Sequence, residues 1–107
     1  MSTRLGEKLR ELRKQKGLTL EKLADAAGMS KSYLWELENR ESQRPSADKL
    51  AALGDVLGVA YTFFIEEDTR VPEERHMDEA FYRNYQKLDS ESKERLRKIL
   101  ETFQPKN

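Results

Sequence analysis

Side chains that can form hydrogen bonds to the edges of nucleic-acid bases gather in one short segment, SKSYLWELEN, at residues 30–39. Lys31 can donate to guanine, and Ser32 can bond to several bases. Glu36 can accept from the exocyclic amine of cytosine. The segment also holds the single tryptophan of the chain, Trp35. This chemistry is recognition by hydrogen bonding, and it requires a fold that holds one face of the segment outward.

Apolar residues recur at helical spacing through the first part of the chain, and no segment alternates with the period of a strand. Thr19 and Ser30 are predicted to be N-caps, and Gly58 is predicted to end a helix that Pro45 and Ser46 open. The predicted helices span residues 3–16, 20–27, 30–39, 46–57 and 61–65.

Only residues 27–29 separate the second and third predicted helices, and such a short connection sets two helices steeply across each other. Ala24 supplies a small residue where the two helices touch, and Gly28 supplies a residue that tolerates positive φ. Leu34 and Leu37 anchor the later helix in the core. This arrangement is a helix-turn-helix.

Three segments resemble the lambda-repressor-like regulators of the Xre family: LRELRKQKGLT, LADAAGMSKSYLWELEN and RPSADKLAALGDVLGV. The resemblance runs from about Leu5 to Ile65 and implies an all-α fold of five helices. It also implies that the third helix lies in the DNA major groove. In the same way it implies that Arg10 pairs with Glu38, and that both are structural residues.

Two positions depart from the family pattern. Many members begin the second helix with a glutamine that reaches DNA, whereas this chain has Leu20. The usual glycine after Glu-Asn is replaced by Arg40, in a longer loop where Gln43 and Arg44 can also contact phosphate. With the outward face of the third helix, the predicted DNA-contacting residues are Ser30, Lys31, Ser32, Tyr33, Trp35, Glu36, Asn39, Arg40 and Arg44.

Each of these assignments has an alternative. The indole of Trp35 can lie against a sugar or a thymine methyl and donate its N–H to a phosphate, or it can pack against the C-terminal helices or a second copy. Lys31 and Glu36 can be ordinary solvated charges. The first 66 residues can also be a generic helical bundle without this function.

The rest of the chain is predicted to be an acidic linker at residues 67–75 and a helical hairpin at residues 76–104, after a DNA-binding domain at residues 1–66. Met77, Ala80, Phe81, Tyr85 and Leu88 would share one apolar face, and Asp89 and Ser90 mark the break before the second helix. Such stripes must pack on the first domain or on a second copy. We predict dimerisation through Phe81, Tyr85, Leu88, Leu96, Ile99, Leu100 and Phe103.

Composition limits the function. Among 107 residues there is no cysteine and one histidine, His76, so we expect no metal and no cofactor and assign His76 to the surface. The net charge is zero, but the segment from Met1 to Gly17 contains six basic residues and only two acidic ones, which predicts a local basic surface. The sequence has no nucleophile with a base, no phosphate loop and no apolar run of membrane-spanning length, so we expect a cytoplasmic protein that is not an enzyme.

The resulting hypothesis is a sequence-specific regulator of transcription, a repressor that binds a palindromic operator in double-stranded DNA as a homodimer. The alternative is an antitoxin-like or adaptor protein whose hairpin binds a toxin or a peptidase.

Overall fold

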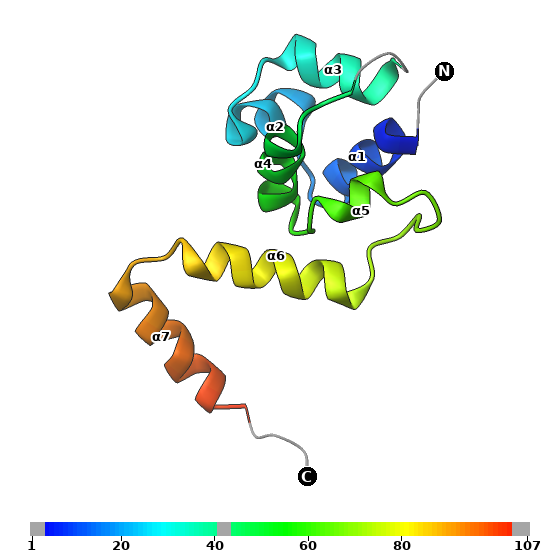
Figure 1. The fold of residues 1–107 in the computed structure, drawn as a ribbon. Helices are drawn as coiled ribbons and strands as arrows, with labels where there is room; N and C mark the ends of the chain where they lie inside the picture. Colours follow the sequence, from blue (N-terminus) through cyan, green and yellow to red (C-terminus); the bar gives the residue numbers. More distant parts are fainter. Residues whose placement is uncertain (1–3, 41–43, 104–107) are drawn as a thin grey trace.

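A computed structural model describes residues 4–40 and 44–103, and every regular element in these ranges is an α-helix (Figure 1). This confirms the predicted all-α fold, five helices followed by a helical pair. Thr3, Gln43 and residue 104 lie outside the described residues. The helices are α1 (Arg4–Gln15), α2 (Leu20–Ala27), α3 (Lys31–Asn39), α4 (Ala47–Leu57), α5 (Thr62–Ile65), α6 (Glu74–Gln86) and α7 (Ser90–Glu101).

The predicted helix caps are confirmed. The side-chain oxygen of the N-cap residue accepts a hydrogen bond from the backbone three residues later in α2, α3, α4 and α7. α2 and α4 end at glycines in the left-handed conformation. The N-caps are Thr19, Ser30, Ser46 and Asp89, and the glycines are Gly28 and Gly58.

The core lies among α1 to α5, where α1 packs on α3 and α5, and α2 packs on α3 and α4. It consists mainly of leucines from the inward faces of these helices, closed by Phe63 and Phe64 of α5. Gly6 allows the close contact between α1 and α3, because a Cβ at this position would overlap the backbone carbonyl of Glu38. α1 therefore supports the back of α3 directly.

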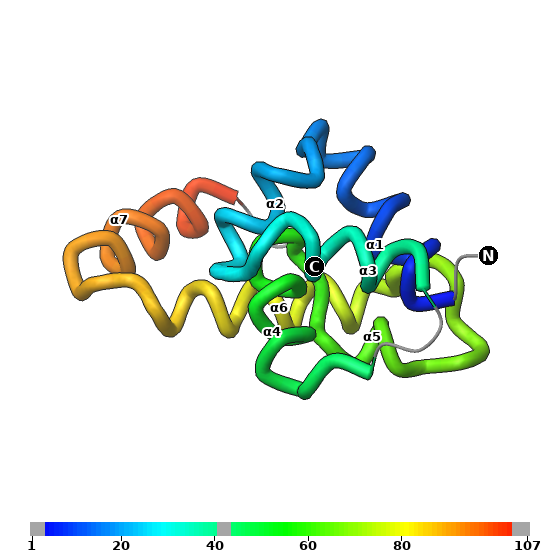
Figure 2. Tube along the Cα trace, turned by 90° about the horizontal axis from the view of Figure 1, so that it is seen from above, coloured from blue at the N-terminus to red at the C-terminus, as the bar shows by residue number. Residues whose placement is uncertain are grey.

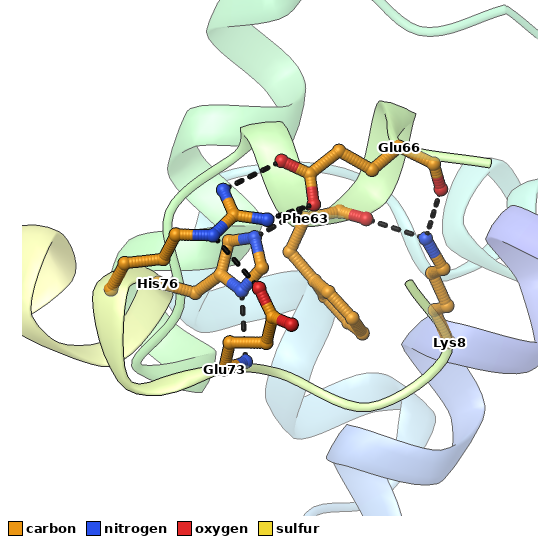
Figure 3. A network of polar contacts seen from close by, with 6 residues as sticks. Lys8, Phe63, Glu66, Glu73 and His76 are labelled. Carbon is orange, nitrogen blue, oxygen red and sulfur yellow. Dashed lines mark hydrogen bonds and ion pairs between the residues drawn. The ribbon is translucent and has the colours of Figure 1, made fainter. Parts of the chain in front are cut away.

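Lys8 is buried, although the basic face predicted for α1 included it. Its ammonium donates to the carbonyls of Phe63 at 2.5 Å and Glu66 at 2.6 Å, and it lies 4.5 Å from the centre of the Phe63 ring (Figure 3). Burial lowers the pKa of Lys8. The lysine thus serves the C-terminal end of α5, where helix carbonyls lack partners, and it is not a surface charge.

The surface assignment of His76 is wrong, because the residue is only 1% exposed. Its ring lies 5.3 Å from that of Phe63, and its Nδ1 accepts the backbone N–H of Glu73 at 2.9 Å. Its Nε2 lies 2.9 Å from Glu66, as Figure 3 shows. The acidic neighbours of His76 suggested a solvated linker, but the first turn of α6 folds back onto α5.

α6 packs on α4 through only part of the apolar face predicted for it. Ala80 is buried against the five-helix body, whereas Met77 and Phe81 are exposed. A small alanine permits close helix packing, so it faces the body while the large apolar side chains lie elsewhere. The residues of the expected single apolar face are therefore divided, with Ala80 on the side that meets the body and Met77 and Phe81 on the exposed side.

α7 has no buried residue and extends away from the five-helix body (Figure 1). α7 contacts α6 through two cations: the Lys93 ammonium lies 5.4 Å and the Arg97 guanidinium 5.8 Å from the centre of the Tyr85 ring. No helix in the described part of the chain has the length and apolar character needed to cross a membrane.

Candidate nucleic-acid interface

The turn between α2 and α3 depends on the backbone of Gly28, which has φ 72° and ψ 35°. The N–H groups of Gly28 and Met29 donate to the carbonyls of Asp25 and Ala24 at 3.2 Å and 2.9 Å. These bonds complete the end of α2, and the buried Ala24 lets α3 approach. The two helices have the helix-turn-helix arrangement.

α3 is anchored by Leu34 and Leu37, which are both fully buried. Lys31, Ser32 and Trp35 are exposed on the opposite side. In Figure 1, α3 lies at the edge of the body that is farthest from α7. The C-terminal helices therefore do not cover the polar face of α3, which is open to a large partner.

Ser30, Tyr33 and Asn39, which were predicted to contact DNA, also make contacts within the protein. The Ser30 hydroxyl caps α3 by accepting from Tyr33 N at 3.1 Å, and the half-buried Tyr33 ring lies 5.5 Å from the Lys49 ammonium. Asn39 accepts from Arg10 at 2.7 Å and donates to the Trp35 carbonyl at 2.8 Å. Because both amide atoms of Asn39 are used, we leave it out of the proposed reading set.

Trp35 is 44% exposed, and the guanidinium of Arg40 lies 5.5 Å from the centre of its indole. Stacking of a guanidinium on an indole orders both side chains at a surface. Arg40 directly follows α3 and Arg44 precedes α4, and both are exposed. This end of α3 therefore presents positive charge beside an aromatic surface, a combination that suits a phosphate and its sugar.

An open concavity of about 380 Å³ lies between the start of α2 and the outward face of α3. Leu20, the first residue of α2, contributes an apolar side chain to it. The site thus joins an apolar side chain to hydrogen-bonding groups, and it can contact a thymine methyl as well as polar base edges. Its lining residues are Leu20, Lys31, Ser32, Trp35 and Glu36.

Glu38 holds the back of α3 to α1. Its carboxylate accepts from Arg13 Nε at 2.8 Å and from Arg13 Nη2 at 3.0 Å, whereas Arg10 Nε lies 3.6 Å away. These bonds raise the pKa of Arg13. The Arg10–Glu38 ion pair that the resemblance implied is therefore present, and Arg10 also donates to the Glu38 backbone carbonyl at 3.3 Å, but Arg13 is the closer partner of the carboxylate. Arg13 lies one helical turn after Arg10, and only the packing of α1 on α3 decides between them.

The basic surplus of α1 is mostly used inside the protein. Lys8 is buried, Arg10 and Arg13 bind α3, and Arg4 donates to the Glu67 carbonyl at 2.5 Å. The remaining basic residues of the segment, Lys14 and Lys16, are exposed. Phosphate contacts from this region must therefore be fewer than the charge count of the sequence suggests.

The helix-turn-helix domain family matches residues 4–61. The chain belongs to this family. The immunity repressor of Bacillus phage phi105 is 33% identical to this helix-turn-helix protein over 98 residues, which cover 91% of this chain and 65% of the repressor. The chain thus spans just under two thirds of that relative.

Two solved structures of SinR are similar to this helix-turn-helix protein. SinR in complex with DNA has a TM-score of 0.55 and 34% identity, covering 58% of this chain and 98% of that one. The SinR/SinI complex has a TM-score of 0.58 and 28% identity, covering 92% of each chain. The second similarity extends beyond the first five helices.

Proposed function

We propose that this chain is a cytoplasmic transcriptional repressor that binds a palindromic operator as a homodimer and reads bases with α3. The proposed role is binding without catalysis. The observation that carries it is the outward polar face of α3, held from behind by two buried leucines and the Glu38 ion pair. A helix fixed in this way presents side chains to a major groove without further ordering. The phi105 repressor and DNA-bound SinR support the assignment.

The proposed reading residues are Lys31, Ser32 and Glu36, with Trp35, Arg40 and Arg44 on the DNA backbone. A bidentate or charge-assisted base contact discriminates by about 1–3 kcal/mol, whereas a phosphate contact acts on all sequences alike. The two groups of residues therefore give different experimental signatures.

A second copy is the proposed occupant of the groove between α6 and α7. The groove has a volume of about 520 Å³, and Phe81 and Leu100 beside it are 61% and 68% exposed. A contiguous apolar surface of this kind marks an interface. Two copies of a helical pair can cover each other as a four-helix arrangement, with the same residues on both sides. The groove is lined by Phe81, Tyr82, Tyr85, Leu96, Arg97, Ile99, Leu100 and Phe103.

The second candidate is a repressor or adaptor whose groove binds a different protein, such as a toxin or a peptidase. It is favoured by the SinR/SinI complex, because that SinR chain resembles this one through the C-terminal helices. Under this candidate the purified chain would be monomeric alone.

Selection of bound sequences from random DNA, followed by a panel of single-base changes, tests the reading helix. Lys31→Ala and Glu36→Ala should each change preference at one or two positions, while Trp35→Ala should weaken binding to every sequence. Lys14→Ala on α1 is the matched control for loss of a surface charge. Unchanged base preference in both α3 variants would show that α3 does not read DNA in this way.

Sedimentation velocity tests the groove. Replacing Phe81 and Leu100 with lysine should give a folded monomer with much weaker operator binding, because two half-sites are no longer coupled. Replacing the exposed Val71 and Met77 with lysine is the matched control. A dimer that survives the first double substitution would place the interface elsewhere.

A further inference from the structure

α6 is attached to the five-helix body along its whole length, although the sequence predicts a hairpin behind a solvated linker. At its start, the backbone carbonyl of His76 accepts the N–H of Ala60 at 3.0 Å, and the imidazole is buried against Phe63. In the middle, Ala80 is buried against the body. These two contacts hold the first half of α6 against the five-helix body.

The far end of α6 is held by one residue of α4, Asp55. Its carboxylate accepts from Arg83 Nε at 2.8 Å and forms a second ion pair with Lys87. Its backbone carbonyl accepts from the Asn84 amide at 3.2 Å. The Asp55 side chain is only 16% exposed, so it lies between the two helices. We call this set, Asp55 with Arg83, Asn84 and Lys87, the Asp55 clamp.

The positions of these contacts give α6 a fixed direction on the five-helix body. From His76 to Lys87 the helix rises by about 16 Å, and a rod held at both ends cannot pivot about either. α4, which carries Asp55, packs on α2, and α2 packs on α3. α6 therefore keeps a set direction relative to α3, and Figures 1 and 2 show it passing beside the body toward α7.

We propose that Asp55 is a specificity-determining residue that sets which spacing between operator half-sites the protein accepts. The inference rests on the proposed homodimer. In that dimer, the direction of α6 determines where the second α3 lies. One inserted base pair moves a half-site by about 3.4 Å along DNA and about 34° around it. If α6 is held rigidly in both copies, the two α3 helices cannot follow such a shift and binding weakens. If α6 is released at the Asp55 clamp, the two α3 helices can follow the shift and binding is retained.

The partners of Asp55 separate this role from plain stabilisation. Arg83 and Lys87 are each more than half exposed, and ion pairs with exposed partners contribute little to the free energy of folding. Removing the Asp55 carboxylate breaks the two ion pairs of the clamp, and it leaves the Asn84 bond to the backbone carbonyl and the buried contacts of His76 and Ala80 in place. We therefore expect Asp55→Ala to change the direction of α6 more than the stability of the fold.

The experiment measures the affinity of the full chain for operators whose half-site spacing changes in steps of one base pair. Wild type should prefer its best spacing over the neighbouring ones by about tenfold or more, and Asp55→Ala should reduce this ratio to about threefold or less. Its melting temperature, its dimerisation and its base preference within a half-site should stay unchanged. Glu91→Ala, which removes an acid from the exposed Glu91–Arg95 pair within α7, is the matched control and should keep the wild-type ratio.

A charge exchange gives a second test, since Asp55→Lys combined with Arg83→Glu and Lys87→Glu should restore the narrow preference that Asp55→Lys alone loses. A dimeric Asp55→Ala protein with the wild-type spacing ratio would overturn the role of Asp55 and leave the homodimer intact. A wild-type chain that is monomeric on sedimentation and indifferent to spacing would overturn the proposed homodimer, and this inference with it.

Discussion

Replacing Arg13 tests which arginine holds the recognition helix. Glu38 is almost fully buried and takes two hydrogen bonds from Arg13, at 2.8 Å and 3.0 Å, whereas the closest ion-pair distance to Arg10 is 3.6 Å. Arg13→Ala therefore leaves a buried carboxylate with one ion-pair partner, Arg10, at 3.6 Å. Arg10→Ala leaves the close pair intact.

The magnitude follows from these contacts. A hydrogen bond to a charged group contributes about 1.5–3 kcal/mol, and breaking a buried ion pair costs about 3–5 kcal/mol. Arg13 is partly exposed and Arg10 can move toward Glu38, so we expect a loss of about 2–4 kcal/mol for Arg13→Ala. Arg10→Ala loses a 2.7 Å bond to Asn39, a 3.3 Å bond to the Glu38 carbonyl and the longer ion pair at 3.6 Å, and because Arg10 is partly exposed the substitution should cost about 1 kcal/mol.

The assay is urea unfolding followed by far-UV circular dichroism, at one protein concentration, because the stability of a dimer depends on concentration. The corresponding fall in melting temperature for Arg13→Ala is about 10–25 °C. Lys14→Ala, at an exposed position of the same helix, is the control and should stay within about 0.5 kcal/mol of wild type. A cost for Arg10→Ala that equals or exceeds the cost for Arg13→Ala would refute this reasoning.

The affinity for DNA should fall with added salt, with a log-log slope of about −0.9 per phosphate neutralised, and Arg44→Ala should make the slope shallower by about 1. A titration of operator binding against salt measures this, and a flat profile would contradict it. Glu66 should make stability depend on pH, because hydrogen bonding, chiefly to Arg75, lowers its pKa from 4.5 to about 2. Since the folded-state pKa is the lower one, its contribution is present above about pH 4.5 and is lost as the pH falls toward 2. Glu66→Gln should therefore have a lower urea midpoint than wild type at neutral pH, and the two midpoints should converge as the pH falls toward 2. Gly6→Ala should destabilise the fold by about 1–3 kcal/mol in thermal unfolding, because its new Cβ meets the Glu38 carbonyl; an unchanged melting temperature would mean that α1 and α3 separate freely.

The helices and the turn were predictable because the signals for them are local. A cap such as Thr19 acts on a backbone N–H three residues away, and a glycine such as Gly28 is selected by its own φ. The outward face of α3 followed in the same way from the positions of Leu34 and Leu37. These features needed no knowledge of what lies across the core.

The misassigned residues all depend on distant partners. Lys8 reads as one more surface cation until α5, 55 residues later, supplies the Phe63 carbonyl. His76 directly follows the acidic linker and reads as a surface residue, but its ring packs against Phe63. Composition predicts solvation for both, and burial became favourable only where fixed hydrogen-bond partners replaced water.

By itself the sequence determined the number of described helices, the capped ends of α2, α3, α4 and α7, the helix-turn-helix and the polar face of α3, since periodicity and caps operate within about one helical turn. The start of α6 at Glu74 lies inside the predicted linker. Only the tertiary structure decided that Arg13 lies closer to Glu38 than Arg10 does, which face of α6 meets the body, and that Asp55 meets Arg83 and Lys87, 28 and 32 residues away. The physical reason is that many side chains along a helix have suitable chemistry, and the packing of whole helices selects the few that come within hydrogen-bond distance.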